Sequence, residues 1–216
     1  MSVFLNTLRD IKSRTADHPA VLVAFSGGKD SLAVLDLCLR HFRRVECFHL
    51  ELVSDLDVTR ERVAEPLARL GVPCRYYPDP VAFKALKHGI FCDPKTEYRL
   101  LTVPTARDAY EEAMADTGIG MVATGKKKAD YRQRAFHMNA GRVFGWHPIR
   151  EWKKADVLAY LQVRGITPPP SHAEAGGIDL TVASLRWLRA THPADFARVA
   201  AWFPYCEAAL VRTDPE

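Results

Sequence analysis

The residues best suited to chemistry form the hexapeptide Ser-Gly-Gly-Lys-Asp-Ser at positions 26–31. Its two glycines let an anion approach the backbone closely, because they carry no Cβ and adopt positive φ at little steric cost. The serines offer hydroxyl donors, Lys29 brings a cation, and Asp30 is suited to capping a helix or holding a magnesium ion. This combination of residue types predicts a site for phosphate groups.

The flanking segments explain how the hexapeptide is positioned. The apolar run at 21–25 is typical of a buried parallel strand, and residues 32–39 favour a helix. A strand that turns into a helix through glycines points several backbone N–H groups at one spot, with the positive end of the helix dipole behind them. The spacing differs from that of P-loop NTPases and from the dinucleotide pattern Gly-x-Gly-x-x-Gly.

The strand, the hexapeptide and the helix together resemble the signature of the PP-loop ATP pyrophosphatases, the superfamily that includes the phosphoadenosine phosphosulfate (PAPS) reductases. The resemblance implies that the loop holds the pyrophosphate end of ATP. It also implies attack at the α-phosphorus, which gives an adenylylated intermediate and pyrophosphate. An ordinary glycine-rich turn between a strand and a helix is the alternative interpretation.

A second group of polar residues follows another apolar segment, 119–125, which we interpret as a buried strand ending in Thr124 and Gly125. The residues after it, 126–134, carry five cations. Because the strand end should face the same sheet edge as the hexapeptide, these cations are candidates for phosphate contacts. The alternative is a run of solvated charges, and contact with a nucleic-acid backbone is a further possibility.

This segment resembles the PAPS reductase pattern Thr-Gly-x-Arg-x-x-Glu-Ser-x-x-Arg. In register, Lys127 stands at the first Arg, Asp130 at the Glu, Tyr131 at the Ser and Arg134 at the last Arg. Lysine keeps the charge at position 127 but lacks the two-pronged geometry that arginine offers to a phosphate or sulfate.

A third motif, at 147–160, resembles the family stretch Pro-Ile-x-x-Trp-x-x-x-Asp-Val-x-x-Tyr. Trp152, Asp156 and Tyr160 recur every four residues, so we expect them on one face of a helix. We expect this helix to pack its aromatic face on the sheet and to steady the basic loop before it. The three motifs together span residues 21–160.

The order strand, helix, strand, helix, strand over residues 21–77 predicts parallel pairing with right-handed crossovers. We therefore expect an α/β fold with a doubly wound, mostly parallel sheet, and the resemblance implies an adenine nucleotide alpha hydrolase-like, Rossmann-like architecture. Prolines 168–170 and the glycines at 176–177 are expected to set off a small helical C-terminal appendage. The predicted domains are 1–165 and 166–216, and the second is a candidate lid or dimer contact.

Other segments support or interrupt this pattern. The strand at 45–50 brings His49 and Glu51 to the same sheet edge, where we expect them beside the adenosine; a structural role is the alternative for the histidine. Residues 57–70 predict a helix that ends at Gly71. Residues 81–104 are basic and less regular, and we expect either a substrate-facing insertion or a surface excursion.

The resemblance and the residue types together assign a candidate site. Lys29, Lys127 and Arg134 are expected to neutralise charge on the phosphates in the transition state. ATP is the expected ligand, and Mg²⁺ is a further candidate. The expected nucleotide-binding residues are Ala24, Phe25, Ser26, Gly27, Gly28, Asp30, Ser31, His49, Glu51, Thr124 and Gly125.

Bulk composition narrows the class of protein. The 216 residues are 48% hydrophobic and 26% charged, which is ordinary for a globular chain that buries one core. We expect a cytoplasmic protein, because no apolar run approaches a membrane span and the N-terminus lacks the pattern of a secretion signal. The five scattered cysteines do not predict a metal or iron–sulfur site. The net charge of +4 suits a nucleotide as well as a nucleic acid.

Three functions remain open from the sequence. The first is transfer of AMP from ATP, with release of pyrophosphate, to an unidentified acceptor such as a nucleic-acid base or a small molecule. The second is sulfonucleotide reduction, for which Cys206 would be the thiol; the family's Glu-Cys-Gly-x-His setting is missing around it. The third is a non-catalytic nucleotide-binding regulatory subunit. A homodimer is a candidate assembly, and no membrane partner is expected.

Overall fold

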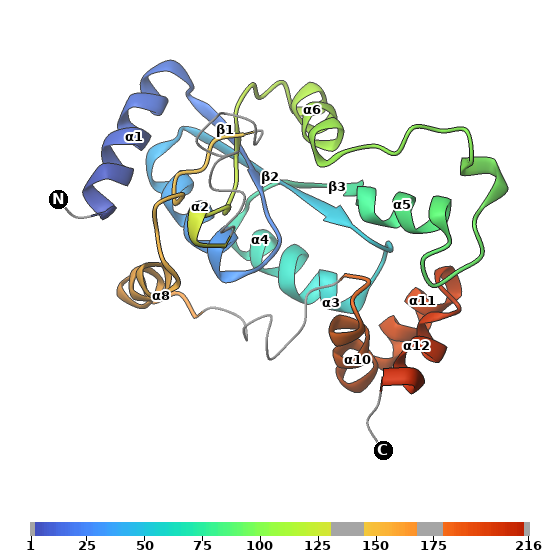
Figure 1. The fold of residues 1–216 in the computed structure, drawn as a ribbon. Coiled ribbons are helices and arrows are strands. Elements are labelled where there is room, and N and C mark those ends of the chain that lie inside the picture. Colours follow the sequence, from blue (N-terminus) through green and yellow to red (C-terminus); the bar gives the residue numbers. More distant parts are fainter. Residues whose placement is uncertain (1–2, 131–144, 168–178, 214–216) are drawn as a thin grey trace.

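The fold is built on a four-stranded sheet with strand order β3-β2-β1-β4, seen in a computed structural model that describes residues 3–130, 145–167 and 179–213 (Figure 1). All strand pairs of this sheet are parallel, which confirms the predicted doubly wound α/β fold. The strands are β1 (Ala20–Ala24), β2 (Arg44–Glu51), β3 (Cys74–Pro78) and β4 (Val122–Ala123).

Helices cover both faces of the sheet, and further helices follow at the C-terminal end (Figure 1). Helix α6 lies on one face, and α2, α4 and α8 lie on the other. The helices are α1 (Val3–Asp17), α2 (Lys29–His41), α3 (Asp57–Thr59), the π-helix η1 (Arg60–Ala64), α4 (Glu65–Leu70), α5 (Pro80–His88), the 3₁₀ turns η2 (Thr96–Tyr98) and η3 (Lys128–Asp130), α6 (Ala106–Thr117), α8 (Lys154–Val163), α10 (Val182–Thr191), α11 (Pro193–Trp202) and α12 (Cys206–Thr213). None of these described helices is long and apolar enough to span a lipid bilayer.

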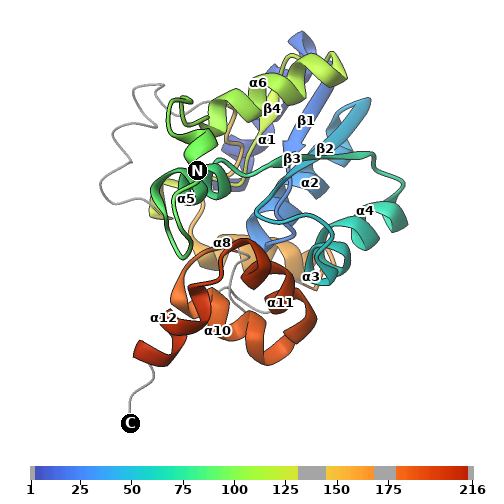
Figure 2. The ribbon, with the colours of Figure 1, turned by 90° about the vertical axis from the view of Figure 1, so that its right-hand side faces the viewer.

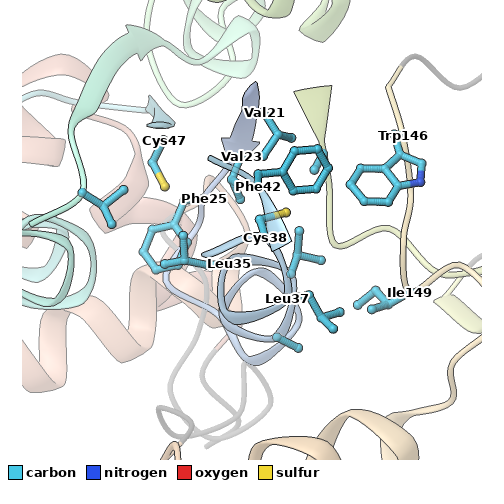
Figure 3. Close-up of a cluster of buried hydrophobic side chains, with 14 of the residues drawn as sticks. Val21, Val23, Phe25, Leu35, Leu37, Cys38, Phe42, Cys47, Trp146 and Ile149 are labelled. Carbon is cyan, nitrogen blue, oxygen red and sulfur yellow. The ribbon is translucent and has the colours of Figure 1, made fainter. Parts of the chain in front are cut away.

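The central strand β1 is apolar along its whole length because both of its faces are covered. Val21 and Val23 point to the face covered by α2, where they join a buried cluster (Figure 3). Leu22 points to the opposite face and packs with Phe48 of β2 and Tyr110 of α6. Full burial of such side chains contributes about 1.5–3 kcal/mol each, so this strand and its two coverings fix the edge on which the hexapeptide lies.

Several predicted boundaries are confirmed, and others need correction. Gly71 ends α4 with φ +65°, as predicted, but the helix that it ends contains a π-helical turn at Arg60–Ala64 that the sequence did not predict. The strand expected over 119–125 is short, since only Val122 and Ala123 pair with β1.

The segment after β3 is more regular than we expected. Residues 80–88 form helix α5, whereas we expected 81–104 to be less regular. Asp79 caps the helix by accepting a hydrogen bond from the Val81 N–H at 2.8 Å, and Gly89 ends it with φ +71°. An Asp-Pro start and a glycine end are ordinary helix signals, so this helix could have been predicted.

The expected common helical face of Trp152, Asp156 and Tyr160 is wrong for Trp152 and Asp156. Trp152 precedes α8, and the Asp156 carboxylate turns back to accept the Lys153 N–H at 2.7 Å as a cap. The rings of Trp152 and Tyr160 do contact each other, with centroids 5.3 Å apart. The ring centroid of Phe4 in α1 lies 4.8 Å from that of Trp152. The Tyr160 hydroxyl also donates to Asp36 of α2, so these aromatic residues join α8 to α1 and α2.

The C-terminal helices α10, α11 and α12 lie together at one end of the molecule (Figure 2). They share a hydrophobic cluster with the rest of the chain. Side chains from α10, α11 and α12 pack with residues 52–58 and with α5. Asp195 of α11 is fully buried and accepts the N–H groups of Asp57 and Val58 at 2.9 and 2.8 Å. Arg198 donates to the same carboxylate at 2.7 Å. The proposed division at residue 165 stays a prediction, and 168–170 and 176–177 lie outside the described residues.

We expect Asp195→Ala to lower the free energy of unfolding by about 3 kcal/mol, because the buried N–H of Val58 and the partly buried N–H of Asp57 lose their acceptor and Arg198 keeps only its contacts with Asp55 and Asp57. Urea denaturation measures this difference. The matched control is Glu207→Ala on α12, where the side chain is exposed and a change within about 0.5 kcal/mol is expected. Equal denaturation midpoints for Asp195→Ala and the wild type would contradict the role of this carboxylate.

Candidate functional site

The strand order creates a switch point between β1 and β4. From β1 the chain adds β2 and then β3 on one side, and it later returns to place β4 on the other side. In open parallel sheets, ligands bind outside the carboxyl ends of the strands at such a point. The hexapeptide follows β1 and the pair Thr124-Gly125 follows β4, so both motifs lie at this edge.

A glycine in each of the two loops is closely packed, Gly125 against the hexapeptide loop and Gly27 against η1. A Cβ on Gly125 would lie 3.0 Å from the backbone carbon of Asp30. A Cβ on Gly27 would lie 2.5 Å from the carbonyl oxygen of Arg62, and the backbone there has φ +71°. Only glycine fits at Gly27, and any substitution would displace the loop.

The N-terminus of α2 is available for an anion. Gly28 is its N-cap residue, and no side chain caps the helix. The Ser31 hydroxyl donates to the Gly28 carbonyl at 2.9 Å and lies 3.3 Å from the Ser26 hydroxyl, so the two serines flank the first turn. Uncapped N–H groups and the positive end of the helix dipole together favour phosphate.

A cavity of about 430 Å³ opens at this edge of the sheet. One part of its wall is apolar and comes from Ala24, Phe25, Phe48, Leu50, Leu52 and Tyr110. The rest is polar and comes from Ser26, Asp30, Ser31, His49, Thr59, Arg62, Asp79, Thr124, Gly125, Lys126, Asp130 and Asp179. A cavity lined by both apolar and polar residues suits a ligand that carries both a flat ring and charged groups.

The structure brings most of the predicted site residues to this cavity. Those that line it are Ala24, Phe25, Ser26, Asp30, Ser31, His49, Thr124 and Gly125. Gly27, Gly28, Lys29 and Lys127 lie in the same two loops but do not line it. Arg134 lies outside the described residues.

Lys29 and Lys127 both pair with Asp30. The Lys29 ammonium donates to Asp30 Oδ2 at 2.7 Å, and the Lys127 Nζ lies 2.7 Å from the same oxygen and 2.9 Å from Asp130 Oδ2. Lys127 is only 1% exposed, and neither of its ion pairs has the geometry of a hydrogen bond. The buried ammonium therefore keeps donor capacity between the two loops.

Asp30 offers one oxygen that suits a metal ion. Its Oδ1 is buried and has no hydrogen-bond partner among the described residues. Within 3–130, 145–167 and 179–213, no group of three or more His, Cys, Asp or Glu side chains could hold a metal by itself. A magnesium ion here would thus need ligand phosphates to complete its coordination, as Mg²⁺ commonly does.

His49 fixes the end of β1 from the neighbouring strand. Its Nδ1 lies 2.8 Å from the Phe25 carbonyl oxygen, and because a carbonyl can only accept, Nδ1–H is the donor. Burial lowers the pKa of His49 below its ordinary value of 6.5, and the hydrogen bond and Asp79 oppose this shift. The ring is therefore neutral near pH 7, and it holds the residue before Ser26 in place.

We expect this buried histidine to cost stability in weak acid. Above pH 6.5 the ring is neutral in both states, whereas below 6.5 the unfolded chain takes up a proton that the folded chain does not. The free energy of unfolding of the wild type should therefore fall relative to His49→Asn as the pH drops from 6.5 towards the lowered pKa. Thermal unfolding between pH 5 and 7.5 measures it. His88→Asn, at the exposed end of α5, is the control, and parallel wild-type and His49→Asn profiles would contradict the account.

Glu51 lines a different cavity, of about 500 Å³, next to the first. Its neighbours there include Asp55, Asp57 and Tyr76, and Thr59 lines both cavities. Burial and the nearby Asp55 raise the pKa of Glu51 above its ordinary value. Glu51 therefore lines the second cavity and not the one beside the hexapeptide.

Cys206 lies at the start of α12 with its side chain fully buried in the C-terminal cluster. Burial raises the pKa of its thiol, which disfavours the thiolate form that acts as a nucleophile. It does not line the cavity of about 430 Å³.

Sequence reasoning missed several lining residues. Asp79 follows β3 and could have been found by the rule that placed His49, since all strands end at one edge. Tyr110, Arg62 and Asp179 come from two helical segments and from the chain before α10, and they reach the cavity through tertiary packing. No local signal marked them.

Comparisons with known proteins agree with this architecture. A family model described as the phosphoadenosine phosphosulfate reductase domain matches residues 20–175. No curated protein matches the chain. A solved NH₃-dependent NAD synthetase from Campylobacter jejuni, in complex with the nitrate ion, is similar at a TM-score of 0.54 and 14% identity, covering 99% of this chain and 96% of that chain. A PAPS reductase from Candida auris, solved as a phosphate complex, has a TM-score of 0.49 and 19% identity, covering 76% and 80%. At 14% identity, the similarity to the synthetase shows that the two chains share a fold.

Proposed function

Because the chain belongs to the phosphoadenosine phosphosulfate reductase domain family and has an adenine nucleotide alpha hydrolase-like fold, we propose that it binds ATP in the cavity at the switch point and transfers AMP. One observation carries the proposal: the uncapped N-terminus of α2 lies beside a cavity of about 430 Å³ that has an apolar wall. Phosphates suit the helix end, and an adenine ring suits the wall.

The binding mode follows from the residues around the cavity. Phe48, Leu50 and Tyr110 provide apolar and aromatic surface for the base. The first-turn N–H groups of α2 and the Ser26 hydroxyl provide donors for the phosphates, and the Ser31 hydroxyl would join them by releasing the Gly28 carbonyl. Positioning of the phosphates by fixed donors is the main source of rate in phosphoryl-type transfers.

The proposed reaction is a displacement at the α-phosphorus. A nucleophilic oxygen or nitrogen of the acceptor forms a bond to this phosphorus, and the bond to the oxygen that bridges to the β-phosphate breaks. Pyrophosphate leaves with the electron pair. The acceptor gains the adenylyl group and loses its proton to solvent or a base. We expect the acceptor to be a nucleic-acid base or a small molecule.

Two lysines are available to stabilise the charge that builds up on the leaving pyrophosphate. Lys127 is buried between the loops, and Lys29 precedes the aspartate that both lysines contact. Arg134 stays a candidate for the same role from outside the described residues. Mg²⁺ would supply further charge neutralisation when bound, with Asp30 Oδ1 as the protein ligand.

Sulfonucleotide reduction is less well supported by the geometry. That reaction needs an accessible thiolate to attack sulfur, whereas the Cys206 thiol is buried and its pKa is raised by burial. A non-catalytic nucleotide-binding subunit would use the same cavity, and it differs from the enzyme only in turnover.

The test is incubation of the protein with ATP, Mg²⁺ and panels of small-molecule and RNA acceptors, with pyrophosphate release as the readout. We expect ATP to bind and pyrophosphate to appear with at least one acceptor. Binding without release from any acceptor would favour the regulatory subunit, and failure to bind ATP would overturn the proposal. In parallel, thiol-dependent sulfite release from PAPS that is lost in Cys206→Ser would restore the reductase interpretation.

A further inference from the structure

Arg62 is a cation of the cavity that the sequence motifs do not contain. Among the described lysine and arginine side chains, Arg62 and Lys126 line the cavity, whereas Lys29 and Lys127 pair with Asp30. Lys126 follows β4 and lies over the ring of Tyr110, with Nζ 5.6 Å from the ring centroid. Arg62 comes from a different part of the fold. Arg62 belongs to the π-helix η1, and π-helical turns are frequent at functional sites.

The backbone of Arg62 supports the phosphate loop directly. Its carbonyl oxygen occupies the space that a Cβ on Gly27 would need, at 2.5 Å. The hexapeptide therefore folds against this turn of η1, and the Arg62 side chain emerges beside the loop to line the same cavity. Burial lowers the pKa of Arg62, although a guanidinium stays protonated at any physiological pH.

Trp187 of α10 contacts the Arg62 guanidinium. The Arg62 Cζ lies 4.5 Å from the centroid of the Trp187 ring, which is the geometry of a cation–π contact. The indole is itself supported, because the His192 ring lies 5.3 Å from it and the His192 Nε2 lies 3.3 Å from a Glu61 oxygen. Helix α10 and its C-cap residue His192 thus contact two successive residues of η1, Arg62 and Glu61.

The contact with Trp187 lowers the entropy that the Arg62 side chain would lose on binding a ligand. A free arginine side chain loses rotamer entropy when it binds, whereas a stacked guanidinium is already oriented. The indole lies 4.5 Å from the guanidinium carbon, and a guanidinium can donate two N–H groups to two oxygens of one phosphate. Helix α10 therefore supplies the aromatic ring that orients a cation of the cavity, which the sheet and its loops do not supply.

We propose that Arg62 binds the phosphate end of the nucleotide and that Trp187 positions it, so that helix α10 sets the affinity of a site otherwise built on the sheet. This inference rests on the proposed nucleotide binding. Its chemistry predicts that the contribution of Arg62 depends on the ligand's phosphates and not on its base.

Isothermal titration calorimetry of the full chain with ATP and with adenosine tests the inference. We expect Arg62→Ala to weaken ATP binding about 10- to 100-fold and to leave adenosine binding unchanged, and Arg62→Lys to recover little of the loss. Trp187→Leu should weaken ATP binding about 10-fold in the wild type but less than about 2-fold on the Arg62→Ala background, because both changes remove one interaction. A purely structural tryptophan would weaken both backgrounds equally, which would overturn the positioning role.

One matched control comes from η1 and the other from α11, the helix that follows α10. Arg60→Ala removes the other arginine of η1, which pairs with Asp57 and Glu65 and does not line the cavity. Trp202→Leu removes an exposed tryptophan of α11. Both should bind ATP like the wild type. If the wild type prefers ATP to adenosine and Arg62→Ala keeps that preference, the inference fails while the proposed function stands. If the wild type binds neither ligand, both fail.

Discussion

Gly27→Ala is expected to weaken ATP binding at least about 100-fold while the chain stays folded. The new methyl group would lie 2.5 Å from the Arg62 carbonyl oxygen, and a backbone oxygen cannot move aside as a flexible side chain can. The loop must therefore shift away from η1, which turns the first N–H groups of α2 out of position. Displacement of several charge-assisted hydrogen bonds is worth a few kcal/mol, and about 2.7 kcal/mol corresponds to 100-fold.

The matched control for this substitution is Gly71→Ala. Gly71 has a similar φ of +65°, but a Cβ there would meet nothing within 4 Å. Both variants are therefore destabilised by about 1 kcal/mol, because alanine adopts a left-handed backbone conformation there. Only Gly27→Ala adds a collision with the Arg62 carbonyl oxygen. Calorimetry gives the affinities, and urea denaturation shows that both variants fold. Wild-type ATP affinity in Gly27→Ala would contradict the proposed phosphate site.

The second large effect is expected from Lys127→Met, which should lower the rate of pyrophosphate release at least about 100-fold. The substitution keeps the length of the side chain but removes a buried charge that lies 2.7 Å from Asp30 and 2.9 Å from Asp130. Without the ammonium, the carboxylates repel each other and the incoming phosphates, and the charge that grows on the leaving group loses a buried partner. Loss of one such group commonly costs 10²–10³ in rate.

Lys128→Met is the control for this prediction. Lys128 is the next residue, yet its side chain is more exposed and pairs with Glu151. Its removal should change the rate less than about 2-fold, since exposed ion pairs contribute little. Single-turnover measurements at saturating ATP separate the chemical step from binding. Equal rates for Lys127→Met and Lys128→Met would show that the buried lysine has no part in the reaction.

The fold was largely predictable because its signals are local. The apolar run before the hexapeptide predicted β1, and the glycines and serines predicted a turn into α2. The two ends of α6 also have local signals, because Thr105 forms a capping box at its start and the left-handed Gly118 ends it. Each of these features depends on residues within one or two turns of each other, so the sequence contains them in full.

The arrangement of charges was less predictable, because it depends on tertiary contacts. The lysines at 126–128 have the sequence pattern of a solvated run, yet Lys127 is 1% exposed because Asp30 and Asp130 close over it. Arg62 was an ordinary helical arginine in the sequence, and its partner Trp187 is more than a hundred residues away. Asp156 had helical spacing with two aromatic residues but caps α8, since a carboxylate in the first turn can satisfy a free N–H.

The central claim is that the N-terminus of α2 holds the phosphates of an adenine nucleotide. The most direct measurement is the chemical shift of backbone amides during titration with ATP and with adenosine. We predict that ATP moves the amides of residues 27–31 and 124–126 strongly, and that adenosine leaves those of 27–31 nearly unchanged. The account is contradicted if ATP binds without moving the amides of 27–31, for example by perturbing those of residues 55–60 around the second cavity instead.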